Sequence, residues 1–150
     1  MAQTMNTNLN GELLTNAINF LTYMDETNGY EHLNIPICFI DCDPDALYIF
    51  FQRESVVYKT DINLSLINDE LKEFAWSKIN RCNHFKTNGE VCGCGEQPGH
   101  SFVVIGKKFD NLCNCAICIT NPSTEEFDKA KELIEACKHC IDEEKKGAQK

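Results

Sequence analysis

The chain has 150 residues, of which 43% are hydrophobic and 25% are charged, proportions typical of one globular domain with a buried core. Its formal net charge of −9 argues against phosphate backbones and anionic lipid, so we expect neither nucleic acid nor a membrane as a partner. The ten cysteines are too sparse for a disulfide-stapled mini-protein, and the N-terminus has no secretory signal. We therefore expect a cytoplasmic protein with reduced thiols.

The N-terminal half predicts a helix followed by short strands. Residues 1–8 are polar, and we expect them to be disordered. Apolar residues recur at helical spacing over 9–24. Three short apolar runs rich in β-forming residues come next and predict an antiparallel meander; they lie at 37–40, 46–51 and 56–58.

A second helix and a long loop follow. Apolar residues return to helical spacing over 66–82, with Trp76 off the centre of the stripe, where we expect it to pack at the edge of the core. Residues 83–100 have no hydrophobic periodicity and contain several glycines and a proline, which predicts a loop. A loop of this length inside a compact domain is usually functional or held by another group.

The C-terminal part predicts a hairpin and a long helix. Residues 102–105 and 112–119 are β-rich and flank GKKFDN, which we interpret as the turn. Ser123 and Glu126 form the pattern of a capping box at the start of the last helix. That helix has a regular core-facing stripe, formed by Phe127, Ala130, Ile134, Cys137 and Ile141.

Together these elements predict an α+β fold, in which a mainly antiparallel sheet of about five strands is packed by three helices. We expect a single domain over 9–142, with a Cys/Gly-rich metal-binding loop at 82–100 and a solvated tail at 143–150.

The strongest chemical signal is the cysteine-rich stretch that runs from Cys82 to Cys118 and holds six of the ten thiols. Thiolates and imidazoles placed around glycine turns are the ligands of tetrahedral zinc. We predict a site formed by Cys82, Cys92 and Cys94, with Cys113 as the preferred fourth ligand because its strand leads back past the loop. The alternative ligands are His84, His100 and Cys115.

The remaining cysteines favour burial. On a regular strand Cys113 and Cys115 share one face and Cys118 points the other way, so these three form a poor ligand set unless the strand breaks. We expect Cys118 to be buried as a small apolar side chain. Cys137 and Cys140 lie one turn apart on the last helix, where core packing is favoured over a second metal site.

An apolar strand ends in D-x-D at Asp41 and Asp43. This run, residues 37–45, is similar to the nucleophile motif of haloacid-dehalogenase-like phosphotransferases, in which the paired aspartates hold magnesium. The similarity covers only these residues, and a second strand follows at once where that family has a loop and a helix. We therefore interpret Asp41, Asp43 and Asp45 as parts of a surface turn.

These observations favour a small protein with a structural zinc site that binds a ligand or a protein partner, with no catalysis expected. Four protein thiolates leave no coordination position open for water. If only three protein ligands close on the metal, a metal- or thiol-dependent enzyme is the alternative. Four thiolates also suit an iron–sulfur cluster or a redox sensor, and the thiols could simply be reduced and without a role.

Overall fold

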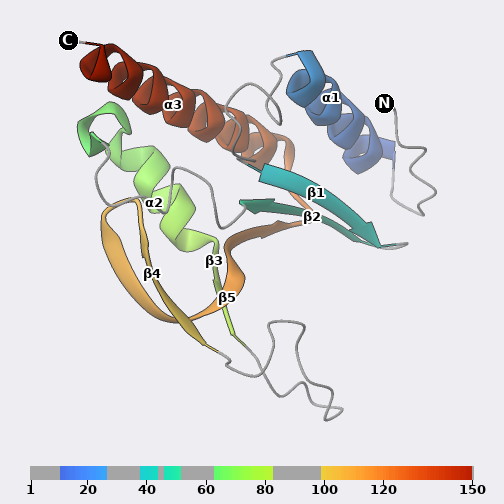
Figure 1. The fold of residues 1–150 in the computed structure, drawn as a ribbon. Helices are drawn as coiled ribbons and strands as arrows, with labels where there is room; N and C mark the ends of the chain where they lie inside the picture. The colour runs from blue at the N-terminus through green and yellow to red at the C-terminus, as the bar shows by residue number, and fades with distance from the viewer. Residues whose placement is uncertain (1–10, 27–37, 44–45, 52–62, 83–98, 150) are drawn as a thin grey trace.

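The computed structural model describes residues 11–26, 38–43, 46–51, 63–82 and 99–149 (Figure 1). It has the predicted α+β architecture, an antiparallel sheet with helices packed against it. The long C-terminal helix and the N-terminal helix lie together over the sheet in Figure 1.

Five strands form the sheet in the order β1-β2-β5-β3, and β4 also pairs with β5. Their bounds are β1 Cys38–Asp43, β2 Ala46–Phe51, β3 Ile79–Arg81, β4 His100–Val104 and β5 Lys107–Thr120. Every pairing is antiparallel, and β5 contacts three of the other four strands. The fold is therefore organised around this one long C-terminal strand.

The two pairing partners of Leu112 show how the strands are arranged around the first half of β5. It is paired with Arg81 of β3 and also with His100 of β4. A strand has only two edges, so β3 and β4 lie on opposite sides of β5 at this point. The chain that joins them, residues 82–99, therefore has both its ends at the same level of β5.

In the described part of the chain three α-helices and one 3-10 turn accompany the sheet: α1 Gly11–Glu26, η2 Leu64–Leu66, α2 Asp69–Ser77 and α3 Thr124–Ala148. The side chain of Asn68 caps α2 by accepting the N–H of Leu71 at 2.8 Å. The predicted capping box at the start of α3 is confirmed, because Ser123 and Glu126 each accept a backbone N–H from the other.

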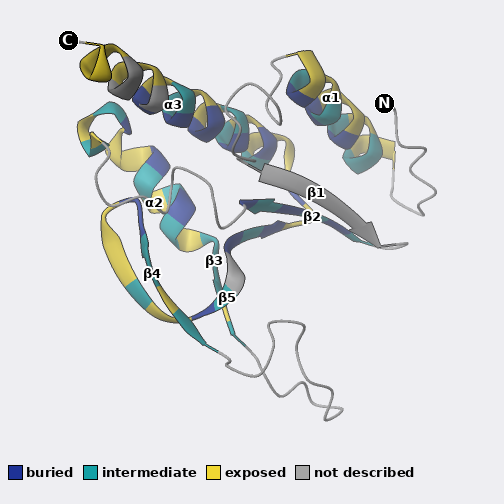
Figure 2. Ribbon diagram, in the orientation of Figure 1, coloured by how far each residue is buried: buried dark blue, intermediate teal, exposed yellow. Residues whose placement is uncertain are grey.

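The core lies between the inner face of the sheet and the helices, as the buried residues in Figure 2 show. Along β2 burial alternates strictly, and Leu47, Ile49 and Phe51 face inward. From the C-terminal helix Cys137 and Cys140 are fully buried, which confirms their predicted role in core packing.

The predicted helix over 66–82 is wrong at both ends. After a 3-10 turn the α-helix covers only Asp69–Ser77, and Ile79–Arg81 form the short strand β3. Ile79 is paired with Ile117, and the carbonyl of Lys78 accepts the N–H of Cys118 at 3.0 Å. Pairing with a strand almost forty residues later overrides the helical spacing, so Cys82 follows a strand and does not end a helix.

The C-terminal hairpin is present, but its predicted turn is wrong. GKKFDN does not form a loop, because Lys107 already begins β5. The connection is the dipeptide Ile105-Gly106, whose φ angles are 47° and 78°, the left-handed pair that a two-residue hairpin turn requires. Isoleucine is unusual at such a φ, and here the side chain is only 1% exposed, so its burial offsets the strain.

In the N-terminal half, α1 and β2 appear where they were expected, but β1 extends through Asp41 and Asp43, which pair with Tyr48 and Ala46. The interpretation of these two aspartates as parts of a surface turn is therefore wrong, and Asp45 lies outside the described residues. β1 pairs antiparallel with the strand that follows it, unlike the parallel strands of a doubly wound phosphotransferase fold. The predicted strand at 56–58 and the disordered segment 1–8 lie outside the described residues.

At the C-terminus α3 continues to Ala148, so most of the expected tail at 143–150 is helical, and its described side chains are exposed. Within the described ranges, no helix combines the length and the apolar character needed to cross a bilayer.

Candidate metal centre

Two of the predicted zinc ligands, Cys82 and Cys113, lie on neighbouring stretches of chain. Arg81 is paired with Leu112, and one residue further the N–H of Cys82 donates to the carbonyl of Asn111 at 2.8 Å. Cys82 and Cys113 are therefore diagonal neighbours across the β3–β5 pairing. Diagonal neighbours are typically about 7–8 Å apart between Cα atoms, within reach of two side chains that converge.

The strand alternation places both thiols on the same side of the sheet. Leu112 is fully buried, and Cys113 follows it, so Cys113 lies on the outer face. Arg81 is directly opposite Leu112 and shares its face, so Cys82, the next residue, also lies on the outer face. Both cysteines are half-buried.

His100, an alternative ligand, lies on the other face. It is directly opposite Leu112, and its ring centroid is 5.8 Å from that of Phe102. Its Nε2 atom is buried and has no hydrogen-bond partner among the residues that the structure describes. The register thus separates His100 from the side of the sheet that carries Cys82 and Cys113.

The regular strand assumed for the 113–118 stretch is not observed. The three residues of β3 span six residues of β5, from Leu112 to Ile117, so the pairing is irregular there. Ala116 and Ile117 are neighbours and both fully buried, which strict alternation does not allow. The irregularity changes which side chains share a face.

Cys118 directly follows this irregular stretch of β5. It is half-buried, so the prediction that it is buried like a core side chain is wrong. Burial raises the pKa of the Cys118 thiol, a contact with Thr120 at 3.9 Å opposes the rise, and the charge of Cys113 adds to it. Burial is the first of these causes, so the half-buried position of Cys118 on β5 is what chiefly sets the direction of its pKa.

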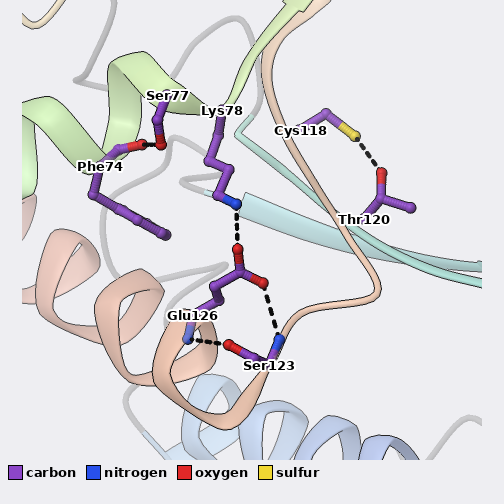
Figure 3. A network of polar contacts seen from close by, with 7 residues as sticks. All are labelled: Phe74, Ser77, Lys78, Cys118, Thr120, Ser123 and Glu126. Atoms are coloured by element: carbon purple, nitrogen blue, oxygen red, sulfur yellow. Dashed lines mark hydrogen bonds and ion pairs between the residues drawn. The ribbon is translucent and has the colours of Figure 1, made fainter.

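Figure 3 shows that a polar network lies next to Cys118. Lys78, whose carbonyl holds the N–H of Cys118, forms an ion pair with Glu126 of the capping box. Burial raises the pKa of Glu126, but hydrogen bonds from Lys78 and from the Ser123 backbone, with the Lys78 charge, lower it overall. The network connects the start of α3 to Lys78, which directly follows α2 and whose carbonyl accepts the N–H of Cys118.

The same elements enclose a groove of about 390 Å³ between α2 and the start of α3. Its two cations are engaged, because Lys78 pairs with Glu126 and Lys129 pairs with Glu70. Glu125 is the remaining charged side chain of the lining, and among the described residues it has no ion pair. Since both cations are already neutralised, we assign the groove no ligand.

The other predicted ligands lie beyond what the structure describes. Cys92, Cys94 and His84 fall in 83–98, and for Cys115 only the backbone, within β5, is described. Among the described residues, no group of three or more His, Cys, Asp or Glu side chains could hold a metal ion. Of the predicted ligands, the described part of the chain thus places Cys82 and Cys113 on neighbouring stretches and His100 on the opposite face of the sheet.

Comparison with protein-family models, with curated proteins and with solved structures finds no match to this chain. Function is therefore inferred from its own residues.

Proposed function

We propose that this chain is a small zinc-stabilised binding module. Cys82, Cys92, Cys94 and Cys113 hold one zinc ion, and the metal fixes the segment between β3 and β4 on the outer face of the sheet. The fixed segment provides the surface for a protein or small-molecule partner.

The observation that carries this proposal is the convergence of Cys82 and Cys113 on one face of neighbouring strands. Zinc–sulfur bonds are about 2.3 Å long, so two thiols that share an ion must come from backbones that lie close together. The segment that contains Cys92 and Cys94 begins directly at Cys82 and returns to the sheet at His100, beside Leu112. Its length allows its C-x-C pair to reach the same face.

The register also favours Cys113 over His100 as the fourth ligand. His100 shares the face of Leu112, whereas Cys82 and Cys113 both alternate away from it. With four thiolates the metal has no open position, which is the arrangement of a structural and not a catalytic zinc ion. Binding of the ion would then contribute directly to the stability of the folded segment.

Hydrogen exchange before and after zinc removal tests the proposal. We expect a strong chelator to accelerate amide exchange across 82–113 and to leave the middle of α3 unchanged. Cys82→Ser should reproduce the effect without chelator. Cys118→Ser is the matched control, because Cys118 is also half-buried on β5 but is not a proposed ligand. Unchanged exchange across 82–113 after complete metal removal would refute the role of zinc in fixing this segment.

A further inference from the structure

Cationic and aromatic side chains alternate along one side of the β3–β5 region. The Nζ atom of Lys107 is 4.9 Å from the ring centroid of Trp76 and 5.5 Å from that of Phe109. The guanidinium carbon of Arg81 is 5.8 Å from the centroid of the same Phe109 ring. These four residues, Trp76, Lys107, Phe109 and Arg81, form what we call the cation–aromatic row.

The two cations of this row differ from most of the described lysines. Lysines such as Lys78 and Lys129 are paired with carboxylates. Within the described residues Arg81 and Lys107 have no carboxylate within ion-pair distance, and Arg81 donates only to the backbone carbonyl of Asp110. Both side chains are exposed, in a chain whose formal net charge is −9. A cation that lies over a ring keeps its charge available to an anion on its other side.

The rings of the row are held in place by the fold. The indole N–H of Trp76 donates to the carbonyl of Val104 at 2.8 Å, which fixes α2 to the hairpin. Trp76 and Phe109 are partly buried against the core. The cations therefore rest on a rigid support, so less side-chain entropy is lost when they bind a partner.

We propose that the cation–aromatic row binds an acidic segment of a partner protein. Carboxylates of that segment pair with Arg81 and Lys107, and its apolar side chains cover the exposed parts of Trp76 and Phe109. This inference goes beyond the proposed function, because Arg81 shares the face of Leu112, opposite to the outer face on which zinc is proposed to fix the segment between β3 and β4. It specifies the chemistry of the partner.

An acidic protein segment fits the row better than a nucleic acid does. Bases stack on open ring faces, but Lys107 and Arg81 already lie over Phe109. The overall negative charge of the chain would also repel a long polyphosphate chain. A partner segment with only a few carboxylates interacts mainly with the nearby cations of the row, because salt screens the more distant negative charges.

The emission of Trp76 provides the assay, because this is the only tryptophan of the chain. We would titrate the full chain with a short polyglutamate peptide and use a polyglutamine peptide of the same length as the control probe. We expect a saturable change in emission with polyglutamate only, and weaker binding at higher salt. The double variant Arg81→Met with Lys107→Met should bind about fivefold to tenfold more weakly, the loss expected for two exposed charge pairs.

Lys131→Met is the matched control, because Lys131 also lies over an aromatic ring, that of Tyr23 at 5.7 Å, but far from the row in the sequence. It should leave the affinity unchanged. Equal binding of the double variant, equal binding of polyglutamine, or tighter binding of single-stranded oligothymidine would each overturn the proposal. Zinc content is measured on the wild-type samples, so that the two proposals fail separately. Absence of polyglutamate binding by protein that contains zinc counts against the row, and polyglutamate binding by protein without zinc counts against the metal site.

Discussion

Replacing Glu126 by glutamine tests how the C-terminal helix is fixed to the rest of the fold. The Glu126 carboxylate accepts the N–H of Ser123 at 2.9 Å and pairs with Lys78 at the end of α2. The side chains of this ion pair are only 27% and 26% exposed. We expect Glu126→Gln to lower the free energy of unfolding by about 1–2 kcal/mol at neutral pH, through the lost ion pair and a weakened cap.

The effect of this substitution should depend on pH. The pKa of Glu126 is lowered from its ordinary value of 4.5, as burial is outweighed by the hydrogen bonds from Lys78 and Ser123 and by the Lys78 charge. A carboxyl group with a lowered pKa in the folded state stabilises the protein above its unfolded-state pKa. That contribution is lost as the pH falls through the folded-state pKa, so the gap between wild type and variant should shrink well below pH 4.5.

Urea denaturation of both proteins, at neutral pH and at a pH well below 4.5, measures this gap. Glu125→Gln is the control, because Glu125 is also in the first turn of α3 but is exposed and takes no part in the cap. Its loss should not exceed about 0.3–1 kcal/mol, the range of a helix-dipole interaction. An equal loss in the two variants, or a gap for Glu126→Gln that does not change with pH, would refute the role assigned to the ion pair.

Three further predictions concern the hairpin and its neighbours. Gly106→Ala should lower the free energy of unfolding by about 1–2 kcal/mol, because residue 106 has a φ of 78°; no loss in urea denaturation would show that the turn adapts. Trp76→Phe should lower the free energy of unfolding by about 1 kcal/mol, because the hydrogen bond to the Val104 carbonyl is lost. Unchanged stability would mean that water replaces the indole N–H as the donor to this carbonyl. Alkylation of Cys118 by iodoacetamide should accelerate only above pH 9.0, because burial and the charge of Cys113 raise its pKa; reaction at the rate of an ordinary exposed thiol would contradict this.

The sequence predicts elements well where the signal is local. The capping box of Ser123 and Glu126 is a contact between residues three apart, and it is found as expected. The strand Ala46–Phe51 is predicted from a short apolar run rich in β-forming residues, and the structure adds that every second side chain of it is buried. In both cases the information needed to place the element lies within a few residues.

The predictions fail where contacts with residues far away in the sequence determine the local structure. Ile79 has helical spacing with the residues before it, but pairing with Ile117 makes it part of a strand. Ile105 occupies a left-handed position that its side chain disfavours, and only its burial in the finished core explains why it is there. Neither burial nor long-range pairing can be read from local propensity.

The candidate site shows the same division. The choice of Cys113 as a partner of Cys82 depended on the expectation that a returning strand passes the loop, and the two residues do lie on neighbouring stretches. The irregular pairing between β3 and β5 was not expected, because the prediction treated 112–119 as a regular strand. Such an irregularity has no clear signature in the sequence of a single chain.

The metal content of the native protein tests the central claim most directly. Elemental analysis of protein purified without added metal should give about one zinc atom per chain, as a four-thiolate structural site requires, with no matching iron or sulfide. Cys82→Ser and Cys113→Ser should each lose the zinc, and Cys118→Ser should retain it. A zinc content far below one atom per chain in the wild-type protein, or full zinc in both ligand variants, would contradict the account.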